Sequence, residues 1–194
     1  MKNPLIMRTD TPYTLNFLIY LQNIYLNQKQ GEEPFKFPYL SELVMFTENF
    51  ELNFKELWEE VSIRISKDGS NVMDLIIFND ETNLFYEKLF IPSSDSLKTY
   101  KEIYIGFRVW WSSYAGSFSV ERSIDDPGHN IYIELTNSLK TNQIEPKKQL
   151  KISLIYDECL LANTEFNSYS TVLSIIDIHT NHKDLVPKLQ SCIS

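Results

Sequence analysis

Glycine is scarce in this sequence, with only five among 194 residues, and no two of them lie closer than ten positions apart. They are Gly31, Gly69, Gly106, Gly116 and Gly128. Phosphate-binding loops need clustered glycines, because their backbone must adopt positive φ and bring N–H groups against an anion. Neither G-x-G-x-x-G nor G-x-x-x-x-G-K-[ST] occurs, and the G-x-S-x-G turn of many hydrolases is absent as well. The sequence therefore excludes these glycine-dependent nucleotide-binding and hydrolytic motifs.

Cysteine and long apolar runs are also scarce. Cys159 and Cys192 are the only cysteines, and neither has the spacing of a metal-binding or redox pair. The first residues hold too short an apolar stretch for a secretory signal, which favours two reduced thiols and a cytoplasmic protein. Asp157 and Glu158 precede Cys159 and disfavour a reactive thiolate there. The early apolar run 17–21 is far shorter than the ~20 residues that cross a bilayer, so we expect no membrane association.

Basic residues are few where acidic residues gather. The net charge is −8, and residues 30–60 hold eight acids against two bases. The acids of this stretch are Glu32, Glu33, Glu42, Glu48, Glu51, Glu56, Glu59 and Glu60. Nucleic acid is a polyanion that proteins bind through lysine and arginine, so this distribution of charge argues against nucleic-acid binding. It favours a basic protein partner, or simply a well-solvated surface.

Helical periodicity dominates the first half. Pro12 suits a first helical turn, Gly31 suits a helix end, and the apolar residues between them recur around most of the cylinder. We therefore expect a buried core helix there rather than a partner-binding helix. Asn53 and Glu56 have capping-box spacing, which predicts a second helix to about residue 60. Residues 61–66 fit either a helix or a strand.

The second half alternates apolar and polar residues with the period of a strand. Alternating segments lie at 103–111, 118–122, 131–135, 150–156 and 172–179, and a further pair lies at 72–78 and 84–91. Short loops with turn residues separate most of them, and such loops join antiparallel strands, because a parallel crossover needs about a dozen residues or more.

These patterns together predict an α+β fold in a single domain. N-terminal helices, at about 10–60, are expected to pack on a C-terminal antiparallel β-meander, at about 61–180. A short helix is expected after Ser94 or Asp95, and another follows the meander from about residue 183.

One cluster has residue types that bind metals. If 172–179 is a strand, Asp177 and His179 point to the same face, and a following turn brings His182 back toward them. Two imidazoles and a carboxylate can hold a divalent metal such as Zn²⁺ or Fe²⁺ with positions left open for substrate. The spacing is unspecific, and a surface turn after a strand explains the same residues without a metal.

A second candidate is the acidic group Glu56, Glu59 and Glu60. On a helix these carboxylates share the side opposite the apolar face, so they should be solvated. Solvated carboxylates make poor general acids at neutral pH, which argues against catalysis. The group is interpreted as a binding patch for a basic partner, with a merely solvated helix face as the alternative.

The third candidate site surrounds the one glycine that falls inside a predicted strand. A glycine within a strand often marks a bulge or a close approach of another backbone or a ligand. On the strand 103–111, Gly106 shares a face with Arg108 and Trp110, opposite the face expected in the core. Either a ligand or partner covers this second face, or helices do.

The function that we expect from these features is protein binding without catalysis. In its acidic, aromatic-rich and glycine-poor composition the chain resembles small inhibitors and immunity proteins that neutralise basic partners, and no motif accompanies this resemblance. The alternative is a small-molecule binder or metal-dependent enzyme with a site between sheet and helices. A homodimer is a further possibility. No catalytic residue and no cofactor are predicted, apart from the metal of the alternative hypothesis.

Overall fold

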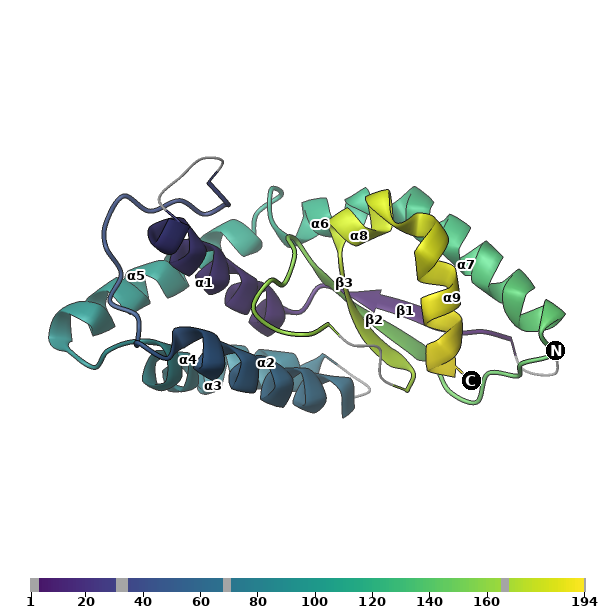
Figure 1. Cartoon of the computed structure of the whole chain (residues 1–194), viewed down its shortest axis with the longest axis horizontal. Helices are drawn as coiled ribbons and strands as arrows, with labels where there is room; N and C mark the ends of the chain where they lie inside the picture. The colour runs from purple at the N-terminus through teal and green to yellow at the C-terminus, as the bar shows by residue number, and fades with distance from the viewer. Residues whose placement is uncertain (1–3, 31–34, 68–70, 165–167, 194) are drawn as a thin grey trace. The chain divides into compact units, whose positions relative to one another are not determined.

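The computed structural model describes residues 4–30, 35–67, 71–164 and 168–193, without the side chains of Gln30, His182 and Lys183 (Figure 1). Within these ranges the chain is mostly helical, with one three-stranded sheet. It divides into two compact units. The helical unit comprises Pro12–Ala115 and Cys159–Asn163, and the sheet unit comprises Met1–Thr11, Gly116–Glu158 and Thr164–Ser194. None of the described helices is both long and apolar enough to span a membrane.

The helical unit is built around the first helix. Its helices are α1 (Tyr13–Gln30), α2 (Phe50–Lys67), α3 (Val72–Asp80), α4 (Thr82–Leu89) and α5 (Ser94–Trp111). Aromatic side chains from four of them meet in its core. The fully buried Phe17 of α1 lies 5.8 Å from Phe78 of α3, 5.3 Å from Phe85 of α4 and 5.1 Å from Phe107 of α5 between ring centroids. Such tilted and edge-on contacts stabilise aromatic pairs beyond the area that they bury.

The structure confirms the predicted core helix, and the second helix is longer than predicted. α1 is buried on nearly every side, as its apolar residues around most of the cylinder indicated. α2 begins at Phe50, before the predicted start at Asn53, and continues as helix through 61–66 to Lys67. Its buried residues recur at spacings of three and four, which is the helical period. They are Phe50, Phe54, Leu57, Trp58, Val61 and Ile65.

The predicted antiparallel meander is wrong, because most of its strands are helices. Segment 72–78 falls in α3, residues 84–89 of segment 84–91 fall in α4, and segment 103–111 falls in α5. The buried residues of α5 have helical spacing and include Tyr100, Ile103, Phe107 and Trp111. Ile105 and Val109, which completed the apparent alternation, are 59% and 68% exposed. The apparent period of two in segment 103–111 therefore combines buried residues of the core with apolar residues that are exposed.

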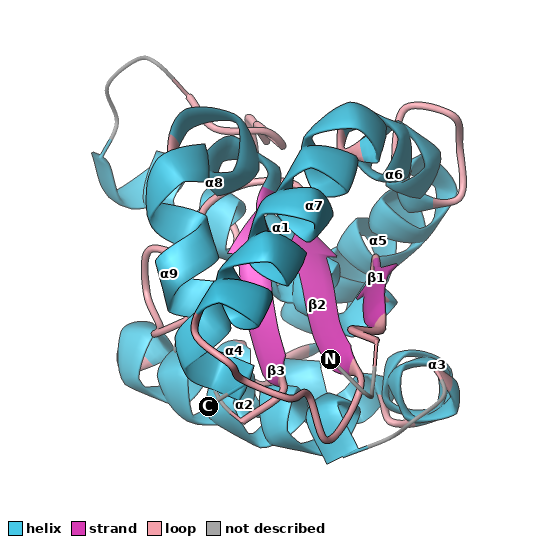
Figure 2. Cartoon of the chain, turned by 90° about the vertical axis from the view of Figure 1, so that its right-hand side faces the viewer, coloured by secondary structure: helices cyan, strands magenta, loops and turns pink. Residues whose placement is uncertain are grey.

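The sheet unit contains a small sheet whose strands are all parallel. Its elements are β1 (Met7–Asp10), α6 (Ser117–Ser123), α7 (Asp125–Thr141), β2 (Leu150–Ile155), β3 (Ser170–Ser174), α8 (Ile175–Thr180) and α9 (His182–Ile193). The strand order is β1-β2-β3, with Thr9 opposite Ile152 and Ile152 opposite Thr171. Every residue of the central strand β2 is buried, as is usual for a parallel strand covered on both faces. Figure 2 shows α7 and α9 side by side across one face of this sheet.

The segments that were expected to form the middle of the meander supply helices instead. Residues 118–122 and 131–135 lie in α6 and α7, which occupy the connection that precedes β2. Only two of the predicted strand segments contain strand. Segment 150–156 contains β2, and the first part of segment 172–179 contains the end of β3. β1 escaped prediction because a four-residue strand is too short to show a period.

Candidate functional site

The helix α5 carries the residues that were expected to line a second sheet face. Because they lie on a helix, Gly106 and Trp110 share one side, whereas Arg108 is turned away from both and is exposed. The Trp110 ring packs on α1 and on the segment 35–46, with centroid distances of 5.9 Å to Tyr20 and 4.8 Å to Phe37. The structure therefore keeps Gly106 and Trp110 together and separates Arg108 from them.

Beside Gly106 lies a cavity of about 300 Å³, which we call the α5 cavity. It is formed by α1, α5 and the segment 35–46. Its floor consists of the buried side chains of Tyr20, Val44 and Ile103. Ser41, Glu42, Glu102 and Gly106 line it and are exposed, whereas Leu40 and Thr99 line it and are half-buried.

The segment 35–46 is held in place at both ends. Asn27 Nδ2 on α1 donates hydrogen bonds to the carbonyl oxygens of Lys36, at 2.7 Å, and Pro38, at 3.0 Å. At the other end, Phe46 forms an antiparallel bridge with Phe90. The wall of the cavity that faces α5 is thus fixed by defined backbone contacts rather than left as a loose loop.

The residues that line the cavity include three ionisable side chains, Tyr20, Glu42 and Glu102, beside the hydroxyl groups of Ser41 and Thr99. Tyr20 is only 7% exposed, and its hydroxyl forms no hydrogen bond with any residue in the described part of the chain. Burial raises the pKa of the Tyr20 phenol, which keeps it neutral. Glu42 and Glu102 add two carboxylates, and Lys98 Nζ lies 3.9 Å from Glu102 Oε1 in an exposed pair. The cavity therefore combines an apolar floor with a hydroxyl and negative charge.

The second predicted patch, on α2, is also exposed. Glu56 and Glu59 lie on one line of the helix between Leu52 and Ile63, because these four positions fall within a narrow arc of a 3.6-residue period. Leu52 is 59% exposed and Ile63 is 48% exposed. We call Leu52, Glu56, Glu59 and Ile63 the α2 stripe. Neither carboxylate of the stripe pairs with a basic side chain among the residues that the structure describes.

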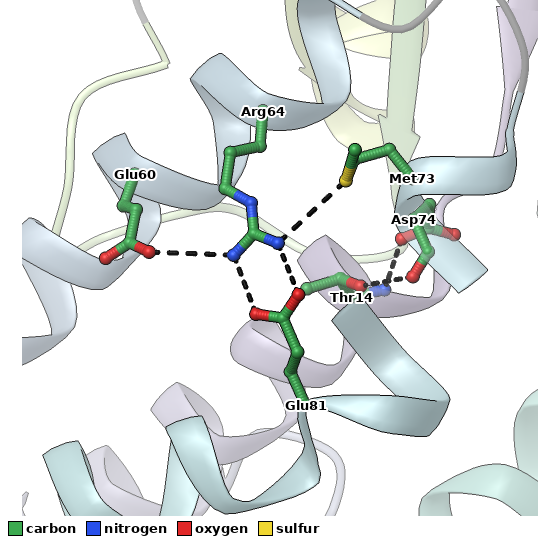
Figure 3. Close-up of polar contacts among 6 residues, drawn as sticks. All are labelled: Thr14, Glu60, Arg64, Met73, Asp74 and Glu81. Atoms are coloured by element: carbon green, nitrogen blue, oxygen red, sulfur yellow. Dashed lines mark hydrogen bonds and ion pairs between the residues drawn. The ribbon is translucent and has the colours of Figure 1, made fainter. Parts of the chain in front are cut away.

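Glu60, the third acid of the predicted patch, belongs to a separate cluster of polar contacts (Figure 3). Its Oε1 lies 3.6 Å from Arg64 Nη1. Arg64 also donates to both carboxylate oxygens of Glu81, with 2.8 Å between Nη1 and Oε2, and contacts the sulfur of Met73. The Arg64 guanidinium lowers the pKa of the Glu81 carboxyl through these hydrogen bonds. This cluster ties α2 to α3 and to the start of α4, so we assign Glu60 a structural contact.

The proposed metal ligands do not share a strand face. Asp177 and His179 lie on the short helix α8, where positions two apart point in different directions. The Asp177 carboxylate accepts a hydrogen bond from Ser174 Oγ at 2.7 Å, and the Ser174 side chain in turn accepts one from the Asp177 backbone N–H. Asp177 thus completes a capping box at the start of α8. The side chain of His182 lies outside the described residues, and the described side chains contain no group of three or more potential ligands that could hold a metal.

Both cysteines are free thiols. Burial raises the pKa of Cys159 to about 12 and that of Cys192 to about 11. A thiol that remains protonated at neutral pH is a poor nucleophile. The geometry therefore gives no support to cysteine chemistry at either position.

A buried ion pair in the sheet unit had no signal in the sequence. Lys151 Nζ on β2 lies 3.5 Å from Asp10 Oδ2 at the end of β1, and Ser153 Oγ donates to Asp10 Oδ1 at 3.0 Å. Both charged side chains are nearly inaccessible to solvent. The register of the parallel strands creates this pair, because Asp10 lies opposite Ser153 and thus diagonal to Lys151.

Sequence reasoning also missed the rest of the α5 cavity. Tyr20 falls among the apolar residues expected in the core helix, Glu42 lies far from Gly106 in the sequence, and Glu102 lies just before the segment 103–111 that was expected to be a strand. The one usable signal was Gly106 itself, which stood out as a glycine inside an element.

Comparisons with known proteins give no counterpart for this arrangement. No protein-family model matches the chain, and neither the curated proteins nor the solved structures contain a significant match to it.

Proposed function

We propose that the protein is a cytoplasmic binding module without catalytic activity that docks a basic partner protein on the α2 stripe. The observation that supports this function is the exposed pair Glu56 and Glu59 between two exposed aliphatic side chains, Leu52 and Ile63. The free thiols Cys159 and Cys192 support a reducing compartment.

The composition of the stripe suits protein recognition. The two carboxylates attract a basic surface and accelerate its encounter with α2. The aliphatic side chains at either end supply apolar area that a partner can bury, which carries most of the energy of a close contact. Because Glu56 and Glu59 have no basic partner among the described residues, their charge is available for such an encounter.

Charge reversal on the stripe tests this function. The full chain, its Glu56→Lys/Glu59→Lys variant and a matched Glu87→Lys/Glu134→Lys variant are immobilised and exposed to lysate of the source cells. The control makes the same change of charge at exposed carboxylates of α4 and α7. A basic protein captured by the wild type is then purified, and its Kd is measured for all three chains at low and high salt.

We expect the stripe variant to bind the purified partner at least about tenfold more weakly, whereas the control binds with little change. Higher salt should weaken wild-type binding, because the attraction is electrostatic. Equal binding of the stripe variant and the control would overturn the proposal. The mass of the chain in solution tests the homodimer, which remains a separate prediction.

A further inference from the structure

We propose that the α5 cavity binds an alkylammonium group, which is a cationic nitrogen on an unbranched apolar chain. The source of this group is either a free small amine or the lysine side chain of a partner protein, and the two share the same chemistry. The inference uses none of the residues of the α2 stripe, and it therefore stands or falls independently of the proposed function.

The first argument is the space beside Gly106. Glycine within a helix destabilises it relative to alanine, so such a position usually has a packing reason. Here packing gives none, because a Cβ built on Gly106 would meet only Tyr20 Oη, at an ordinary contact distance of 3.8 Å. The absence of a side chain instead leaves the cavity open on the α5 side.

The second argument is the polar group at the cavity floor. Tyr20 is more than nine-tenths buried and lines the cavity, yet its hydroxyl has no hydrogen-bond partner in the described part of the chain. The hydroxyl oxygen itself is not sealed from solvent, so it is open to a hydrogen bond from a molecule in the cavity. A neutral phenol can accept a hydrogen bond from an ammonium group, and its ring offers a face to a cation.

The third argument is charge. Apart from the neutral phenol of Tyr20, the ionisable residues that line the cavity are Glu42 and Glu102, and both are acidic. Lys98 approaches Glu102 only as an exposed pair four residues away on the same helix, and pairs of that kind are weak. An anionic ligand would meet repulsion from both carboxylates, whereas an ammonium group would form charge-assisted hydrogen bonds with them.

The fourth argument is size and shape. A cavity of about 300 Å³ lies at the lower end of the range of ligand pockets. Leu40, Val44 and Ile103 line it with aliphatic side chains. The space therefore fits one short alkyl chain rather than a nucleotide or another large cofactor.

Binding of n-hexylamine, measured by calorimetry and by NMR chemical shifts of the full chain, tests the proposal. At neutral pH this probe is an alkylammonium ion, and 1-hexanol and hexanoate are its neutral and anionic counterparts. We expect saturable binding of hexylamine with shifts at Tyr20, Ile103 and Gly106, binding of hexanol about tenfold weaker, and no binding of hexanoate. The proposal is overturned if hexylamine does not bind, or if hexanol binds equally well.

Two variants test whether hexylamine binds in the α5 cavity. Gly106→Leu fills the cavity and should abolish binding, while Glu102→Gln removes one carboxylate and should weaken it about tenfold. Glu87→Gln, at an exposed carboxylate of α4 outside the cavity, is the matched control and should bind like the wild type. If Gly106→Leu does not fold, Glu102→Gln alone decides, because its side chain is exposed. Unchanged binding in Glu102→Gln overturns the assignment to this cavity.

A comparison of two peptides decides whether the ammonium group comes from a free amine or from the lysine side chain of a partner protein. A short alanine peptide with one central lysine is compared with the same peptide carrying norleucine. Tighter binding of the lysine peptide than of hexylamine identifies a partner side chain as the ligand, and binding of hexylamine alone identifies a free amine. Glu56→Lys/Glu59→Lys should leave hexylamine binding unchanged. The experiment therefore distinguishes failure of the proposed docking on the α2 stripe from failure of the proposed amine binding in the α5 cavity.

Discussion

The carboxylate of Asp74 accepts a hydrogen bond from the backbone N–H of Thr14 at 2.9 Å, although sixty residues separate the two (Figure 3). Its other oxygen accepts from the N–H of Tyr13 at 2.8 Å, and the Thr14 hydroxyl donates to the Asp74 carbonyl oxygen at 3.1 Å. A side chain of α3 thus caps the start of α1, where helix N–H groups lack partners within the helix. Negative charge at this end also complements the helix dipole.

Asp74→Ala should lower the free energy of unfolding by about 2–3 kcal/mol, because it leaves two N–H groups of a buried helix start without an acceptor. Urea unfolding followed by circular dichroism measures the change. Asp80→Ala, at an exposed position of the same helix, is the control and should change stability by less than about 0.5 kcal/mol. Equal effects of the two variants would show that the cap contributes nothing.

The contact between Arg64 and Glu81 predicts an acid-sensitive contribution to stability. Arg64 holds the pKa of Glu81 below its value of 4.5 in a free side chain, so the pair stabilises the fold above that pH and loses its effect as the pH falls. Both side chains are about one-third exposed, which limits the contribution to less than about 1 kcal/mol. Glu81→Gln should therefore destabilise the protein at neutral pH and have little effect in acid.

Glu60→Gln is the matched control for that measurement, because Glu60 lies 3.6 Å from the same guanidinium without the paired hydrogen bonds of Glu81. Its effect at neutral pH should be the smaller of the two. A pH-independent loss in Glu81→Gln would contradict the explanation through the carboxyl pKa.

Gly106→Ala should stabilise the protein. The position lies inside α5, and the new methyl group meets no atom closer than 3.8 Å. Alanine is favoured over glycine in a helix interior by about 0.8–1.0 kcal/mol, so the free energy of unfolding should rise by roughly this amount. Thermal and urea unfolding measure it, and a loss of stability would show that the backbone at Gly106 needs glycine after all.

Alkaline pH should lower the free energy of unfolding, because burial raises the pKa values of several groups. Burial raises the pKa of Tyr20, of Tyr100 and of Cys159, the last to about 12. In the unfolded chain these groups ionise near their ordinary values of 9 to 10, while the folded chain keeps its protons. The unfolded state then binds fewer protons, and the free energy of unfolding falls by up to about 1.4 kcal/mol per pH unit for each group.

Urea unfolding at increasing pH measures this slope, and Tyr100→Phe separates its causes. The variant loses the hydrogen bond from its hydroxyl to Thr82 at every pH, which lowers stability by a constant amount. It also removes one titrating group, so its decline above pH 10 should be shallower than that of the wild type. Parallel curves for the two proteins would exclude Tyr100 as a source of the slope.

Local patterns predicted α1 and β2, in which nearly all apolar residues are buried. α1 has apolar residues around most of its surface, and β2 is buried along its whole length, so burial and periodicity agree in both. In α5 they disagree, because the exposed Ile105 and Val109 completed a strand-like alternation with the buried Ile103 and Phe107. The capping box at Ser93, with its partner Ser96, was the local signal of a helix there.

The sequence by itself excluded the glycine-dependent motifs, located the acidic stretch and singled out Gly106, because composition and spacing do not depend on the fold. Tertiary structure decided which apolar residues are buried, that the strands pair in parallel, and that Asp74 caps α1. It also placed Tyr20 and Glu42 beside Gly106 around a cavity. These contacts join residues far apart in the chain, whereas helix and strand periods reflect only neighbours within a turn or two.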